Sequence, residues 1–104
     1  MNIEVRKATK QDMPAVLKLI NELAKFENEP DAVEITVKDL ENDGFGDRPL
    51  FECFVAEAND TIEGMALFYY RYSTWKGKTV HLEDLVVSEA FRGKGLGKAL
   101  YTKV

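Results

Sequence analysis

A glycine-rich turn near the end of the printed sequence has the residue spacing most typical of ligand binding. Arg92, Gly95 and Gly97 form an R-x-x-G-x-G pattern that follows a hydrophobic segment and precedes a helical one. A strand-to-helix turn of this kind presents free backbone N–H groups and the positive end of a helix dipole. Both features favour phosphate, so the pattern predicts a polyphosphate site.

Other phosphate-binding loops do not match this turn. A Walker A loop requires glycine where the sequence has Arg92, and Ser or Thr where it has Ala99. The dinucleotide fingerprint requires its third glycine at Lys98. A kinase glycine loop belongs near the start of a large domain, whereas this turn closes a small one. A structural turn that uses glycine only for positive φ is the remaining alternative.

Acidic side chains occur at two further points. Glu83 and Asp84 lie in the segment that leads to the turn, and strand alternation directs them to opposite faces. The acidic stretch 27–31 follows a helical segment; it fits either a site for a cationic substrate or a solvated loop. His81 and Cys53 are the only residues of their types, and neither has a partner for nucleophilic catalysis. Both are predicted to be structural, and no metal site is predicted.

The apolar periodicity indicates which elements position these residues. It predicts strand 3–8, helix 10–27 capped by Thr9, and a short helix opened by Thr36 and closed by a left-handed Gly44. Strands 51–58, 62–72 and 79–87 follow, with a turn at 59–60, an alternation that fails at 85–87, and a helix from Gly95. The order β-α-α-β-β-β-α predicts an α+β fold with a mostly antiparallel sheet flanked by helices.

Composition limits the class of protein. A chain of 104 residues is about one small domain, and its net charge of −4 gives no reason to expect a nucleic-acid or anionic-membrane partner. No stretch approaches the length of a membrane span, and a single cysteine excludes an internal disulfide framework. A cytoplasmic location is the expectation by default.

The stretch HLEDLVVSEAFRGKGLGKAL resembles the acetyl-coenzyme A motif of the GNAT superfamily of N-acetyltransferases, R/Q-x-x-G-x-G/A. The segments ELAKFE, KDLENDGFGDRP, ALFYYRYSTWKGKTVHLED and FRGKGLG are similar to the spermidine/spermine (diamine) N-acetyltransferase subfamily, including its thialysine-acetylating branch. The four segments agree in order and spacing over the whole chain. The resemblance implies that residues 1–104 are the N-terminal part of one N-acetyltransferase domain.

The resemblance also implies which residues bind acetyl-coenzyme A. In the family, backbone groups at the end of this strand and in the glycine turn hold the pantetheine and the pyrophosphate. The matching residues are Leu85, Val86, Val87, Arg92, Gly93, Lys94, Gly95, Leu96, Gly97 and Lys98. Arg92 and Lys94 add positive charge, although either also fits a solvated loop.

Acetyl transfer to an amine requires loss of a proton, because a primary amine of pKa ~10.4 is less than about 0.1% neutral at pH 7. By resemblance, Glu83 binds the amine and accepts its proton, and Phe26 and Glu27 lie at substrate positions. Trp75 matches an aromatic residue near the amine channel, where cation–π contact or simple packing are both consistent with its position. Ser73 replaces an acidic residue of the polyamine enzymes, which favours a shorter amine.

The family domain continues beyond the position that matches Val104, and it includes a tyrosine that protonates the departing thiolate. Tyr101 does not match that tyrosine. We therefore expect an exposed sheet edge beside 79–87, self-association, for instance as a homodimer, and little activity of this chain alone. Two alternatives stay open: a non-catalytic cofactor-binding or dimerisation module, and an acetyltransferase for peptides or ribosomal proteins.

Overall fold

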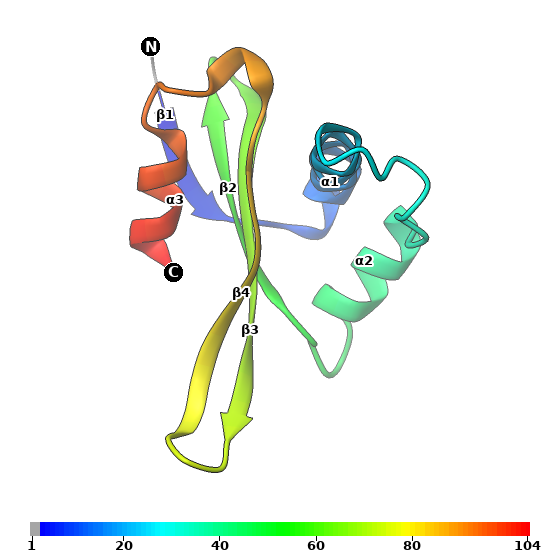
Figure 1. The fold of residues 1–104 in the computed structure, drawn as a ribbon, viewed down its shortest axis with the longest axis vertical. Helices are drawn as coiled ribbons and strands as arrows, with labels where there is room; N and C mark the ends of the chain where they lie inside the picture. Colours follow the sequence, from blue (N-terminus) through cyan, green and yellow to red (C-terminus); the bar gives the residue numbers. More distant parts are fainter. Residues whose placement is uncertain (1–2) are drawn as a thin grey trace.

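The computed structural model describes residues 3–104 and shows a four-stranded antiparallel sheet with helices on both faces (Figure 1). In chain order its elements are β1 (Ile3–Lys7), the 3₁₀ turn η1 (Lys10–Asp12), α1 (Met13–Phe26), α2 (Val37–Phe45), β2 (Glu52–Ala58), β3 (Thr61–Ser73), β4 (Gly77–Val87), η2 (Glu89–Phe91) and α3 (Leu96–Lys103). The predicted α+β class and the order β-α-α-β-β-β-α are confirmed.

The strands lie side by side in chain order, β1-β2-β3-β4. A two-residue turn joins β2 to β3, and its residues Asn59 and Asp60 have φ angles of 54° and 68°. Positive φ at both positions is the type I′ geometry that matches the twist of a hairpin, and Asn and Asp tolerate it better than most residues. The β3–β4 hairpin is longer and extends well beyond β1 and β2 (Figure 1).

The larger core lies between the sheet and the helices α1 and α2. Met13, Val16 and Leu19 of α1 recur at helical spacing and are buried against the sheet. The strand side chains of this core alternate along each strand: Cys53, Val55, Met65, Leu67 and Val86. The predicted facing of strand 51–58, with Cys53 and Val55 on one face and Ala56 on the other, is therefore confirmed.

Helix α3 covers the opposite face of the sheet, alone among the helices of residues 3–104 (Figure 1). Its fully buried Leu96 and Leu100 pack against Ala56 and Ala66. Gly64 lies under the same helix, where an added Cβ would come within 3.1 Å of Leu100 Cδ1. Small side chains at these sheet positions let α3 pack closely, which fixes the helix that follows the glycine turn.

The first helix differs from the predicted range 10–27 at its start. Residues Lys10–Asp12 form a 3₁₀ turn, and α1 begins at Met13 with Pro14 in its first turn. The Thr9 N–H donates to Asp12 Oδ2 at 2.7 Å, and the Thr9 hydroxyl donates to the same oxygen at 3.0 Å. Asp12 also binds Arg6, and this contact holds the entry to α1 in the tighter turn.

The predicted left-handed closure at Gly44 is wrong. Helix α2 continues through Gly44 to Phe45, and the following Gly46 has a φ of −83°. Gly44 instead makes room for Phe51, because an added Cβ would lie 2.7 Å from Phe51 Cε1. The Thr36 cap is confirmed: Asp39 N–H donates to Thr36 Oγ1 at 3.2 Å, and Thr36 N–H donates to Asp39 Oδ2 at 2.9 Å.

Candidate active site

The glycine turn connects the end of β4 to α3 with two residues in left-handed conformation. Gly93 and Gly95 have φ angles of 79° and 88°. Gly95 caps α3, and the Ala99 N–H donates to the Gly95 carbonyl at 3.1 Å. The N–H groups of the first three residues of α3 precede this bond and have no partner one turn back in the helix. Together they form a row of donors at the positive end of a helix dipole.

The space around these glycines fits a polyphosphate. A Cβ added to Gly93 or Gly95 would meet no protein atom within 4 Å, so both backbones are open to a ligand. Gly97 differs, because its Cβ would lie 3.8 Å from Val87 Cγ2, an ordinary contact with the sheet. Leu96 is buried in the core beneath α3 and has only its backbone available. Lys94 and Lys98 are exposed and add positive charge.

A hydrogen-bonded carboxylate holds the segment between β4 and the turn. Ser88 is buried; its N–H donates to the Glu63 carbonyl and its hydroxyl to Glu63 Oε1, both at 2.7 Å. The Thr61 hydroxyl donates to Glu63 Oε2, also at 2.7 Å. The sequence analysis did not identify Glu63. The alternation of residues along the strand cannot predict the role of Glu63, because its partner Ser88 is 25 residues away in the chain.

Helix α1 contacts the same segment through two side chains. Glu22 Oε1 accepts a hydrogen bond from the Glu89 N–H at 2.9 Å. Arg92 Cζ lies 4.9 Å from the ring centroid of Phe26, and Arg92 Nε donates to the Val87 carbonyl at 3.2 Å. The structure thus brings together Phe26, which was predicted to bind the amine, and Arg92, which was predicted to bind the cofactor.

The end of β4 presents backbone groups along a free edge. Within residues 3–104, β4 pairs with β3 alone, so its other edge has unpaired N–H and C=O groups. Val86 is buried in the α1/α2 core, Val87 packs on the α3 side, and Leu85 is exposed. The predicted exposed edge beside 79–87 is confirmed for this part of the chain.

A β-bulge at Glu83 changes where the two acidic residues of β4 point. Leu67 pairs with Asp84 and Phe68 with Leu82, so Glu83 is an extra residue in β4. The predicted opposite facing of Glu83 and Asp84 is wrong, because both line one cavity between β4, α1 and α2. A bulge inserts one residue into the alternation, so neighbouring side chains can share a face. The failed alternation at 85–87 fits either burial on both faces or a bulge, and the structure shows the first: Val86 lies in one core and Val87 packs on the other, while the bulge lies at Glu83.

This cavity has a volume of about 250 Å³ and combines carboxylates with apolar side chains. Asp39 and Asp43 of α2 join Glu83 and Asp84 in its lining, and its apolar walls are Ile20, Ile35, Leu40, Phe51 and Leu67. Burial raises the pKa of Asp84, and the carboxylates of Glu83 and Glu27 raise it further. The sequence analysis missed the two aspartates of α2, although their i, i+4 spacing places them on one helix face.

The remaining predicted residues lie at different distances from this cavity. Glu27 directly follows the last residue of α1, and its carboxylate contributes to the raised pKa of Asp84. Trp75 is 95% exposed at the tip of the β3–β4 hairpin, and the strand from Gly77 to Glu83 spans roughly 20 Å. The structure therefore does not bring Trp75 to Glu83. Ser73 Oγ accepts hydrogen bonds at 3.2 Å from the N–H groups of Trp75 and Lys76 and so orders this tip.

His81 lies beside Glu83, which the sequence analysis did not anticipate. His81 Nε2 is 3.6 Å from Glu83 Oε1, and the imidazole packs on Tyr69 with 5.0 Å between ring centroids. Their i, i+2 spacing in the strand is the signal that could have found this contact. Cys53 is buried as predicted, and desolvation, with a smaller contribution from Asp12, raises the pKa of its thiol to about 12.

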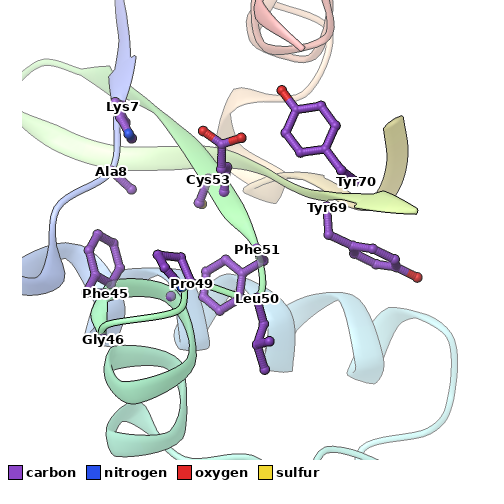
Figure 2. A pocket seen from close by; sticks show the side chains of 12 residues that line it. Lys7, Ala8, Phe45, Gly46, Pro49, Leu50, Phe51, Cys53, Tyr69 and Tyr70 are labelled. Atoms are coloured by element: carbon purple, nitrogen blue, oxygen red, sulfur yellow. The ribbon is translucent and has the colours of Figure 1, made fainter. Parts of the chain in front are cut away.

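A second cavity, of about 550 Å³, contains none of the predicted site residues (Figure 2). It lies where β1 leaves the sheet and the α2–β2 connection passes by, and Figure 2 shows Phe45, Pro49 and Phe51 in a row along one wall. The residues that line it are Lys7, Ala8, Gly44, Phe45, Gly46, Pro49, Leu50, Phe51, Glu52, Cys53, Tyr69 and Tyr70.

Residues 3–104 contain neither a metal-binding cluster nor a membrane-spanning helix. No three His, Cys, Asp or Glu side chains come together in a group that could hold a metal ion. None of the helices in this part of the chain combines the length and apolar character that crossing a membrane requires.

The structure thus combines an antiparallel sheet, whose fourth strand leads through a left-handed glycine turn into a helix, with an acidic cavity beside that strand. The family model described as "Acetyltransferase (GNAT) family" matches residues 14–104. The chain belongs to this family.

Two curated relatives match nearly the whole chain. Spermidine/spermine N(1)-acetyltransferase-like protein 1 of Homo sapiens is 43% identical over 108 residues, which cover 97% of this chain and 16% of the relative. Thialysine N-epsilon-acetyltransferase of Bos taurus is 38% identical over 110 residues, which cover 98% of this chain and 65% of the relative. This chain thus spans less than two-thirds of either relative.

Solved structures show the same fold at lower identity. An aminoglycoside acetyltransferase from an uncultured soil metagenomic sample, in complex with sisomicin, matches with a TM-score of 0.75 and 20% identity; the match covers 97% of this chain and 66% of that one. A ribosomal-protein-alanine N-acetyltransferase from Brucella melitensis matches with a TM-score of 0.74 and 17% identity, over 99% and 68% of the two chains. These likenesses concern the fold.

Proposed function

We propose that this chain forms the cofactor turn and the amine cavity of an N-acetyltransferase that uses acetyl-coenzyme A. The observation that carries the proposal is that one strand, β4, contributes to the cavity and also leads into the glycine turn. Its bulge places Glu83 and Asp84 in an acidic cavity, and its end continues into the open glycine turn. Transfer between two ligands requires that both be held in a fixed mutual geometry, and a single strand that leads to both sites favours this.

The cofactor would be held mainly by backbone groups. The free edge at Leu85–Val87 has donors and acceptors for the amide groups of pantetheine, and the turn Gly93–Lys98 has N–H donors for the pyrophosphate. Arg92 would contribute guanidinium N–H groups, which suit phosphate oxygens. When bound, acetyl-coenzyme A supplies the thioester carbonyl that a neutral amine attacks.

Glu83 would hold the substrate ammonium and take its proton. Glu83 lines the cavity, and its Oε1 lies 3.6 Å from His81 Nε2. A carboxylate in contact with an ammonium group orients it and provides an acceptor for the proton, directly or through a water molecule. Asp84 adds negative potential, although burial and the neighbouring carboxylates raise its pKa. The cavity therefore favours a cation before transfer.

The lining of the cavity favours a small aliphatic amine over a peptide. Its volume of about 250 Å³ is below the usual range for drug-sized ligands, and carboxylates from both α2 and β4 line an apolar interior. A diamine, a polyamine end or a thialysine-like side chain has the matching chemistry of a cation on an alkyl stem. The names of the two curated relatives point to the same class.

The test measures acetyl-coenzyme A turnover with diamines, thialysine and a peptide amine. It uses this chain and a form extended after Val104 by the remaining segment of the bovine relative. We expect turnover with the small amines in the extended form, and a loss of about 100-fold or more in kcat for Glu83→Gln. Glu4→Gln, which changes an exposed glutamate of β1, is the matched control. Cofactor binding without any turnover would support a non-catalytic module, and preference for the peptide would overturn the substrate class.

A further inference from the structure

Phe26 faces the cofactor turn in the structure. The residue is 69% exposed, and the Arg92 guanidinium lies over its ring, with Arg92 Cζ 4.9 Å from the ring centroid. Of the guanidinium donors, Nε already binds the Val87 carbonyl. The two Nη groups have no hydrogen-bond partner recorded in residues 3–104 and stay available for an anion.

A second contact fixes α1 against the same segment. Glu22 lies one helical turn before Phe26, on the same face of α1, and accepts the Glu89 N–H at 2.9 Å. Glu89 opens the η2 turn and Arg92 follows its end, so both ends of η2 contact α1. The ring of Phe26 therefore has a defined position relative to the glycine turn.

The stack limits where the guanidinium can go. An exposed arginine side chain samples many rotamers, and ordering it for a ligand costs conformational entropy. A ring face on one side and a carbonyl acceptor at Nε restrict Arg92 before any ligand binds. Such preorganisation increases affinity without a contact between the ring and the ligand.

We propose that Phe26 is a positioning residue for the phosphates of the cofactor and acts through Arg92. This inference rests on the proposed function and assigns to the cofactor side a residue that the resemblance places on the amine side. Arg92 supplies the charge, and the Phe26 ring holds its guanidinium next to the Val87 carbonyl, at the end of the strand that leads to the glycine turn.

The test is a double-mutant cycle on coenzyme A binding, measured by calorimetry on this chain and on the extended form. The variants are Phe26→Leu, Phe26→Trp, Arg92→Leu and Phe26→Leu/Arg92→Leu. A cation–π contact at an exposed site corresponds to about a two- to fivefold change in Kd, so we expect Phe26→Leu to weaken binding by that factor. Phe26→Trp keeps an aromatic ring and should bind coenzyme A as tightly as wild type. In the Arg92→Leu background, Phe26→Leu should cause no further change in Kd.

A matched control and a spectroscopic readout separate positioning from stability. Tyr72→Leu removes a similarly exposed ring, near the far end of β3, and should leave Kd unchanged. The Arg92 Hε resonance should lose its ring-current shift in Phe26→Leu and keep one in Phe26→Trp. The KM for the amine should stay constant across the Phe26 variants of the extended form.

The possible failures are distinguishable. If the wild-type extended form does not bind coenzyme A, the proposed function falls and this inference falls with it. If it binds and Phe26→Leu binds equally well, or if Phe26→Leu raises only the amine KM, the inference is overturned while the proposed function stands.

Discussion

Arg6 joins the first strand to the start of α1 through two carboxylates. Its Nε lies 2.6 Å from Glu57 Oε1, and its Nη groups lie 2.7 and 3.0 Å from the two oxygens of Asp12. The hydrogen bonds from Arg6, with those from Thr9, lower the pKa of Asp12 to about 2, although burial opposes them. The same partners raise the pKa of Arg6. Bidentate pairing of this kind is among the stronger ionic contacts in proteins.

Asp12→Asn should therefore lower the free energy of unfolding by about 2 kcal/mol at pH 7. A carboxylate whose pKa is lowered on folding adds stability above its unfolded value of 3.8, and loses it as the pH falls toward 2. Urea unfolding at several pH values between 7 and 2.5 checks this. The difference between the two proteins should shrink below pH 4; a difference that is constant with pH would show that packing, not ionisation, is responsible.

Asp84→Asn should raise the free energy of unfolding, whereas Asp12→Asn should lower it. Because burial, Glu83 and Glu27 raise the pKa of Asp84, the folded state holds this proton more tightly than the unfolded state does. Its charge thus costs stability, and the cost grows as the pH rises from 3.8 through the raised value. We expect the variant to be more stable than wild type at pH 7 and equal to it near pH 3.

Glu83→Gln provides the companion measurement at the residue scale. It removes one of the carboxylates that raise the pKa of Asp84, so that pKa should fall toward the ordinary aspartate range. NMR titration of the Asp84 carboxyl carbon measures the change directly. A pKa that does not move would show that the two carboxylates do not interact across the bulge.

At the scale of elements, two glycines of the cofactor turn should respond differently to alanine. Gly95 is left-handed at φ 88°, so Gly95→Ala should cost about 1 kcal/mol and weaken coenzyme A binding. Gly97 lies inside α3 and its added Cβ would make an ordinary contact with Val87. Gly97→Ala should therefore stabilise the chain by about 0.5–1 kcal/mol and leave binding intact. Thermal unfolding and calorimetry together check both variants.

Helix α2 offers a contrasting case. Gly44→Ala adds a better helix former, yet the new Cβ would meet the Phe51 ring at 2.7 Å from Cε1. Overpacking of this kind typically costs 1–3 kcal/mol, which exceeds the gain in helix propensity. We expect a net loss of about 1 kcal/mol in urea unfolding. Restored stability in Gly44→Ala/Phe51→Leu would confirm the steric cause, whereas a stable single variant would contradict it.

At the scale of the whole molecule, the described residues form an elongated shape of 42 × 29 × 28 Å with β4 at one edge of the sheet. An unpaired strand edge favours association with another strand, and Val80 adds an exposed apolar side chain to it. We expect this chain to self-associate at high concentration and Val80→Lys to reduce the association. Analytical sedimentation of wild type and Val80→Lys over a range of concentrations measures the association. A wild type that is monomeric at all concentrations would contradict the prediction.

The sequence alone was sufficient for the elements and for their order. Apolar spacing in α1 and the two-sided apolar strands identified the core, and the glycine spacing identified the turn between β4 and α3, because these features depend on residues close together in the chain. Loop geometry was also local: Asn59 and Asp60 identified a turn, although its type came from the structure.

Tertiary structure decided the features that join distant residues. The bulge that directs Glu83 and Asp84 to one cavity depends on pairing with β3. The room that Gly44 leaves is filled by the ring of Phe51, seven residues away in the connection before β2. The contacts of Phe26 with Arg92 and of Glu63 with Ser88 span 66 and 25 residues. A sequence shows periodicity within an element, but register and contacts between elements arise only when the elements pack, because they depend on which faces meet.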